Sequence, residues 1–103
     1  MSVTFHEVAK AADLADGEMK QVELAGKKIA LFNLKGSFYA IDDLCTHAFA
    51  FLTDGYVEGE EVECPLHAGR FDIRTGKATA PPCTEDVKAY QVKVEGGALL
   101  VGV

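Results

Sequence analysis

Cys45-Thr46-His47 and Cys64-Pro65-Leu66-His67 are the two short motifs that decide the fold of this chain. Each motif supplies one thiol and one imidazole, which are strong protein ligands for iron and zinc. A zinc site with two Cys and two His usually has both Cys in one motif and both His in the other. Because each motif here mixes the two, the pattern favours two neighbouring metal ions, one bound by both thiolates and the other by both imidazoles.

That division of ligands is the one found in a Rieske [2Fe–2S] centre. The two motifs, the spacer 48–63 between them and Pro65 resemble the Rieske motif, and residues 3–103 resemble a small bacterial Rieske ferredoxin. A zinc site that only staples a binding module together is the alternative that the residues leave open. The resemblance implies one [2Fe–2S] cluster per chain with four ligands: Cys45, His47, Cys64 and His67.

Length and composition indicate what class of protein this is. The 103 residues are 49% hydrophobic, which is typical of one folded domain with a modest core. The N-terminal residues lack the pattern of a signal peptide, and no stretch approaches the ~20 apolar residues of a membrane span. We therefore expect a soluble, cytoplasmic protein with no membrane partner, and a monomer.

Cys83 and His6 are the cysteine and histidine outside the two motifs, and neither is expected to bind the metal. Two of the three cysteines belong to the motifs, which leaves Cys83 unpaired, as expected in a reducing compartment. We expect Cys83 to be a small, half-buried residue without a redox role. His6 lies far from the motifs and is expected to be a surface or half-buried residue. Membrane-bound Rieske proteins have a disulfide between the cluster loops, and the corresponding residues here, Ala50 and Leu66, cannot form one.

The formal net charge of −6 indicates which partners the protein has. Nucleic acids and anionic membranes would repel such a chain, so neither is expected as a partner. A basic protein partner fits, because complementary charge speeds a transient encounter. The alternative is that the acidity only keeps the protein in solution.

Alternating hydrophobic runs separated by turn signals predict an all-β fold with no useful helix. Tight turns are expected at 25–27, 35–37, 58–60 and 96–97. In the run 87–94 the side chains of Tyr90, Val92 and Val94 are expected to share one face of the strand. The expected strands are Val3–Val8, Glu18–Leu24, Lys28–Leu34, Phe38–Ile41, Val87–Val94 and Ala98–Val103.

The family resemblance implies the arrangement of these strands. It implies a single Rieske domain at 1–103, made of stacked antiparallel sheets. A base formed by approximately 1–41 and 83–103 would carry a cluster-binding subdomain formed by approximately 42–82, with the cluster at one tip.

The resemblance also implies the function. The chain is similar to the ferredoxins of bacterial aromatic-ring-hydroxylating dioxygenase systems, which pass single electrons from an NAD(P)H-dependent flavin reductase to a terminal oxygenase. An oxygenase needs a further iron site with two more His, and His6 is the only histidine to spare, so the chain is expected to be a carrier and not an enzyme. The alternative of another class is the Rieske small subunit of a reductase such as nitrite reductase.

Residues beside the motifs are expected to tune the carrier. High-potential relatives place a Ser and a Tyr hydroxyl near the cluster, where this chain has Gly69 and Phe71, so a potential at the low end of the Rieske range is expected. Partners are expected to dock at the edges of His47 and His67, beside residues that are small or apolar: Ala48, Phe49, Ala50, Leu66 and Ala68. Phe49 and Leu66 could instead face inward and shield the cluster. Asp42, Asp43 and Asp54 are candidates for long-range steering of a partner.

Overall fold

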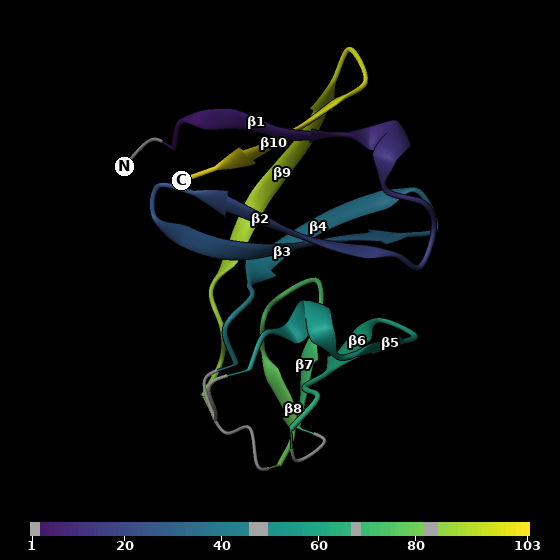
Figure 1. Ribbon diagram of the computed structural model, residues 1–103, viewed down its shortest axis with the longest axis vertical. Helices are drawn as coiled ribbons and strands as arrows, with labels where there is room; N and C mark the ends of the chain where they lie inside the picture. Colours follow the sequence, from purple (N-terminus) through teal and green to yellow (C-terminus); the bar gives the residue numbers. More distant parts are fainter. Residues whose placement is uncertain (1–2, 46–49, 67–68, 82–84) are drawn as a thin grey trace.

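Two antiparallel sheets form the fold. The computed structural model describes residues 3–45, 50–66, 69–81 and 85–103. The larger sheet has six strands in the order β1-β10-β9-β4-β3-β2, and the smaller has four in the order β5-β6-β7-β8 (Figure 1). The expected all-β fold of stacked antiparallel sheets is confirmed, and the only helices in the described residues are two short 3₁₀ helices.

The strands and short helices of the described residues have the following bounds. The larger sheet consists of β1 (Phe5–Lys10), β2 (Met19–Leu24), β3 (Lys27–Leu34), β4 (Ser37–Asp42), β9 (Ala89–Glu95) and β10 (Ala98–Gly102). The smaller sheet consists of β5 (Tyr56–Glu58), β6 (Glu61–Glu63), β7 (Arg70–Asp72) and β8 (Ala78–Ala80). The 3₁₀ helices are η1 (Ala11–Asp13) and η2 (Leu52–Asp54).

Two-residue turns set the register of the larger sheet. Ala25-Gly26 joins β2 to β3 with φ values of 53° and 78°, and Lys35-Gly36 joins β3 to β4 with 54° and 87°. Two successive positive φ angles are the requirement of the type I′ turn, whose twist matches that of the flanking strands. The predicted turns therefore lie where the sequence places them, although each is one residue shorter than expected.

Strand β3 separates two hydrophobic cores. Side chains alternate across a strand, so Ala30 and Phe32 pack into the core on the side of the smaller sheet, whereas Ile29 and Leu31 pack into the core of the larger sheet. All four are at most 1% exposed. Because it is covered on both faces, β3 is a nearly continuous hydrophobic run instead of an alternating one.

The face of β9 that carries Tyr90, Val92 and Val94 is buried along only part of its length. Tyr90 is buried and Val92 is half-buried, but Val94 is 47% exposed. The reason is pairing: β9 pairs with β4 only at Tyr90 and Ala89, and its later residues pair with β10 alone. Val94 lies on the β9–β10 hairpin, which extends beyond the sheet at the end opposite the small sheet (Figure 1).

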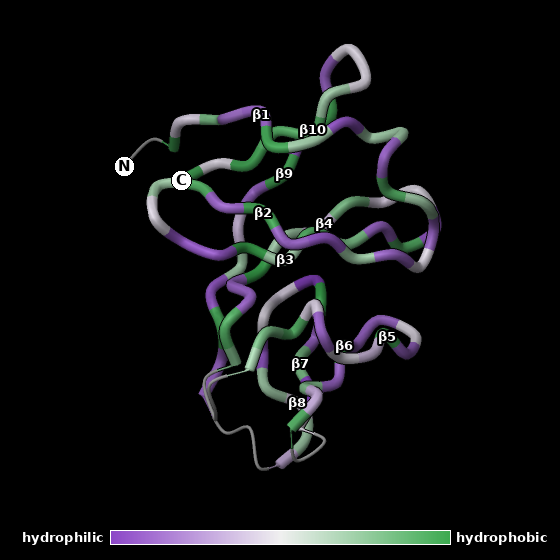
Figure 2. The backbone as a smooth tube through the Cα atoms, in the orientation of Figure 1, coloured by the Kyte–Doolittle hydropathy of each residue, from purple (hydrophilic) through white to green (hydrophobic). Residues whose placement is uncertain are grey.

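Ion pairs connect strands of the small sheet. The guanidinium group of Arg70 on β7 lies 3.0 Å from the carboxylate of Glu58 on β5 and 3.1 Å from that of Glu63 on β6. These acidic neighbours raise the pKa of Arg70, with Glu58 the largest cause. The β5–β6 hairpin carries several hydrophilic residues (Figure 2), and Arg70 offsets part of their mutual repulsion.

Candidate metal centre

The first predicted ligand, Cys45, lies in a hairpin that follows β4. Leu44 forms an antiparallel bridge with Phe51, and the backbone N–H of Cys45 donates to the carbonyl of Ala50 at 2.9 Å. The N–H of Leu52 donates to the carbonyl of Asp43 at 2.7 Å, which closes the hairpin at its base. The two arms that flank the loop after Cys45 are therefore held together by backbone bonds.

The second predicted cysteine is held in the same way. Cys64 lies between β6 and β7, and its N–H donates to the carbonyl of Gly69 at 2.7 Å. In both loops the cysteine N–H thus bonds to the carbonyl five residues further along the chain. Two loops that are distant in sequence therefore have the same kind of backbone closure beside their cysteine.

The two cysteine side chains come together in the core. Cys45 is 3% exposed and Cys64 is 1% exposed, and both belong to the hydrophobic cluster that contains Phe71. Burial raises the pKa of the Cys64 thiol to about 11; a backbone hydrogen bond from Leu66 opposes this effect, and the hydrogen bond and charge of Cys45 add to it. Two adjacent buried sulfurs repel each other when both are ionised, and a shared cation removes that repulsion. This pair of donors therefore fits a single metal ion.

The two predicted histidine ligands, His47 and His67, lie outside the described residues. So do Ala48, Phe49, Ala68 and Cys83, so the predictions made for these residues stay predictions. Within the described ranges no group of three or more His, Cys, Asp or Glu is arranged to hold a metal ion. His6 is exposed on β1, in the larger sheet.

The described neighbours of the cysteines divide into apolar surface and buried core. Leu44 is 44% exposed and Leu66 is 45% exposed, so Leu66 does not face inward as a shield. Ala50 is half-buried. Phe71 is fully buried beside both cysteines, as expected for a packing residue, and the carbonyl of Gly69 is the acceptor for Cys64.

The expected steering role is wrong for Asp43. Its carboxylate is fully buried, where it accepts hydrogen bonds from Gln21 and Thr53. Asp42 is half-buried and accepts a hydrogen bond from Tyr90, whereas Asp54 is exposed. The sequence shows two adjacent aspartates at the end of a predicted strand, but it does not show the contacts with Gln21 and Thr53 that hold Asp43 inside the fold. Sequence reasoning therefore named Asp43 but gave it a surface role in place of a buried one.

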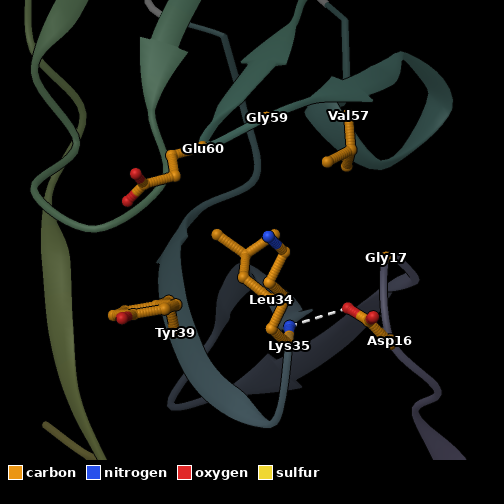
Figure 3. A pocket seen from close by; sticks show the side chains of 8 residues that line it. All are labelled: Asp16, Gly17, Leu34, Lys35, Tyr39, Val57, Gly59 and Glu60. Atoms are coloured by element: carbon orange, nitrogen blue, oxygen red, sulfur yellow. Dashed lines mark hydrogen bonds between the residues drawn. The ribbon is translucent and has the colours of Figure 1, made fainter.

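A groove lies between the two sheets. Leu34 and Tyr39 of the larger sheet face Val57, Gly59 and Glu60 of the β5–β6 hairpin across it (Figure 3). At its rim the N–H of Lys35 donates to Asp16 Oδ1 at 2.7 Å. Of the described residues, neither Cys45 nor Cys64 lines this groove.

Comparison with known proteins gives a consistent result. Residues 4–91 match the model of the Rieske [2Fe-2S] domain family. The ferredoxin component of the naphthalene 1,2-dioxygenase system of Pseudomonas putida is 45% identical over 101 residues, which cover 98% of this chain and 97% of the relative.

Two solved structures are similar along almost the whole chain. The ferredoxin of carbazole 1,9a-dioxygenase from Nocardioides aromaticivorans IC177 superposes with a TM-score of 0.91 at 43% identity, over 95% of this chain and 96% of that chain. A chain in a complex of reduced oxygenase and oxidized ferredoxin in carbazole 1,9a-dioxygenase superposes with a TM-score of 0.91 at 33% identity, over 95% and 92%.

Proposed function

Because this chain belongs to the Rieske [2Fe-2S] domain family, we propose that Cys45 and Cys64 bind one iron of its cluster and that His47 and His67 bind the other. The chain carries a Rieske-type [2Fe–2S] cluster and is an electron-transfer protein, not an enzyme. When bound, the cluster takes up and releases one electron at a time. The observation that carries the ligand proposal is the pair of adjacent buried sulfurs. Each lies in a loop closed by a hydrogen bond from the cysteine N–H to the carbonyl five residues further along the chain.

The carrier serves a multicomponent aromatic dioxygenase system. It delivers electrons to a terminal oxygenase, in line with the carbazole 1,9a-dioxygenase complex of ferredoxin with oxygenase. We infer that it receives them from a flavin-containing, NAD(P)H-dependent reductase. The naphthalene 1,2-dioxygenase and carbazole 1,9a-dioxygenase ferredoxins are 45% and 43% identical to this chain, which favours this function over that of a nitrite reductase subunit.

The setting of the carrier is inferred from its composition. No helix in the described part of the chain is long and apolar enough to cross a bilayer. We infer from the cysteine usage that the protein is cytoplasmic and from the net charge of −6 that it has no nucleic acid or membrane partner, and we propose that it is a monomer. We also propose that the base, approximately 1–41 and 83–103, and the cluster-binding subdomain, approximately 42–82, make up one domain.

The docking surface is inferred from exposure around the cysteines. Leu44 directly precedes Cys45, and Leu66 lies between Cys64 and His67; both leucines are more than 40% exposed. Apolar side chains at the cluster end let a partner approach closely without desolvating a charge. We propose that the reductase and the oxygenase both contact this end of the molecule.

Electron delivery measured by stopped flow tests this docking surface. Leu44→Glu and Leu66→Glu are the test variants, because both leucines are exposed and lie beside a predicted ligand. Each should slow oxidation of the reduced carrier by a naphthalene dioxygenase oxygenase about tenfold, with iron content unchanged. Val94→Glu is the matched control, because Val94 is 47% exposed on the β9–β10 hairpin at the opposite end of the fold. Equal rates for all three variants would exclude docking at the cysteine loops.

The same assay tests the function itself. Reduced wild-type carrier should transfer one electron per chain to the oxygenase. Failure to transfer, together with copurification of the chain with a large reductase, would favour the nitrite-reductase-type alternative. A colourless chain with one bound zinc would favour the zinc-stapled module.

A further inference from the structure

Asp43 is a fully buried carboxylate beside the candidate metal centre, two residues before Cys45. It accepts three hydrogen bonds: from Gln21 Nε2 to Oδ2 at 2.6 Å, from Thr53 N to Oδ1 at 2.8 Å, and from Thr53 Oγ1 to Oδ2 at 2.7 Å. A carboxylate is costly to bury, and this one is kept in place by three donors at once.

The partners of Asp43 come from three parts of the fold. Gln21 lies on β2 and Thr53 on η2, and the backbone N–H of Asp43 donates to the carbonyl of Lys28 on β3 at 3.0 Å. The carbonyl of Asp43 accepts from Leu52 at 2.7 Å. One residue thus ties the outgoing arm of the first cysteine loop to its returning arm and ties both arms to the larger sheet.

The geometry points to Asp43 as a positioning residue for the cluster, an inference that rests on the proposed function. By holding Thr53 and Gln21, its carboxylate fixes the returning arm opposite Cys45. The bond from Cys45 N to Ala50 O then fixes the backbone of the cysteine, and with it the direction in which its sulfur points. Asp43 therefore acts through Cys45 and does not itself touch the cluster.

A purely structural role is the competing explanation, and it predicts different results. If Asp43 only stabilised the fold, variants that remain folded and fully loaded would have a normal spectrum. If Asp43 positions Cys45, folded and fully loaded variants have an altered electron paramagnetic resonance spectrum, because that spectrum reports the geometry at the iron.

Asp43→Asn is the main test variant. It keeps the size of the side chain, but its amide has one acceptor oxygen where the carboxylate has two, so at least one of the three hydrogen bonds is lost. Asp42→Asn is the matched control, because it removes the same charge from the neighbouring residue, which bonds to Tyr90 instead. Thr53→Val removes the hydroxyl donor at nearly constant shape, and Thr53→Ser keeps that donor.

Two measurements on the reduced, loaded protein give the result. The resonance spectrum should change in Asp43→Asn and Thr53→Val, and should be normal in Asp42→Asn and Thr53→Ser. Hydrogen exchange at the amides of Cys45 and Leu52 should be about tenfold faster than in wild type in Asp43→Asn and Thr53→Val, and unchanged in the other two variants. A normal spectrum in fully loaded Asp43→Asn, or unchanged exchange at both amides, would overturn the inference.

The control also separates this inference from the proposed function. If wild-type protein contains zinc instead of two irons, the proposed function fails, and the exchange rates still decide whether Asp43 holds the loop. An equal spectral change in Asp42→Asn and Asp43→Asn would mean that loss of charge is the cause, and would overturn the positioning role.

Discussion

Gly55 lies directly against the backbone carbonyl of Glu63: a Cβ at Gly55 would be 1.9 Å from that oxygen and 3.1 Å from Pro65 Cδ. Gly55 caps η2, which follows the first cysteine loop, and Glu63 directly precedes Cys64. The contact therefore sets how closely the two cysteine loops approach each other, and only glycine leaves room for it.

We expect Gly55→Ala to lower both stability and cluster content. The added methyl group must push the Glu63 carbonyl away, at a cost of about 1–3 kcal/mol, and move Cys64 relative to Cys45. Urea unfolding and iron per chain measure the two effects. Gly59→Asn is the control, because Gly59 has open space and a φ of 61°, which Asn tolerates. A normal iron content in Gly55→Ala would show that the loops do not depend on this contact.

We expect about two irons and two sulfides per purified chain, and no cluster in Cys45→Ala or Cys64→Ala. Each change removes one of two adjacent buried sulfurs, so two loops lose their common anchor and the fold is weakened as well. Visible absorbance and metal analysis measure the loss. Cys83→Ser should have the wild-type spectrum, and loss of colour in that variant would mean that the ligand assignment is wrong.

The strands of the larger sheet could be predicted because their signals are local. Alternating or β-rich runs mark the strands, and pairs such as Ala25-Gly26 mark the turns between them. The turn at 58–60 was predicted, but the strands β5 to β8 were not, since segments of three residues are too short to show alternation. Long-range contacts explain the exposure of Val94, which pairs with β10 alone, and the error at Asp43, which faces inward to meet Gln21 and Thr53.

We expect Ala25→Asn to stabilise the protein. Ala25 has a φ of 53° in the β2–β3 turn, a left-handed conformation that is unfavourable for alanine and well tolerated by asparagine. Unfolding in urea should require about 0.5–1 kcal/mol more free energy. Ala12→Asn is the control, because Ala12 is an exposed alanine without a positive φ. No gain in Ala25→Asn over Ala12→Asn would contradict the assigned turn.

We expect Tyr90 to make stability fall at alkaline pH. Burial raises the pKa of Tyr90 above its ordinary value, and the hydrogen bond to Asp42 adds to the effect. The folded chain therefore holds this proton more tightly than the unfolded chain does. The contribution is complete below pH ~10, the ordinary pKa of tyrosine, and is lost as the pH rises above it.

Tyr90→Phe should be less stable near pH 8 by about 1 kcal/mol and should lose less stability above pH ~10. Urea unfolding between these pH values measures both effects. Tyr56→Phe removes a hydroxyl from a side chain that is 66% exposed and should leave the profile unchanged. Parallel pH profiles for wild type and Tyr90→Phe would rule out Tyr90 as the source.

The last prediction concerns the reduction potential. Phe71 is fully buried in the same hydrophobic cluster as Cys45 and Cys64, and Gly69 bonds through its carbonyl to Cys64, so neither supplies a hydroxyl group near the sulfurs. The reduced cluster is more negative than the oxidised one, and a donor stabilises it more. A low potential is the expected consequence of these two residues.

Gly69→Ser combined with Phe71→Tyr should therefore raise the midpoint potential. A new hydrogen bond that favours the reduced state by about 1 kcal/mol corresponds to a rise of about 40 mV for one electron. The new Tyr hydroxyl would lie in the buried cluster, where an unpaired hydroxyl is costly, so bonding to a sulfur is favoured. Phe71→Leu changes the packing without adding a donor and should leave the potential near that of wild type. A midpoint that is unchanged in the double variant, with full iron content, would mean that the added hydroxyl groups do not reach the cluster and that another property of the loops sets the potential.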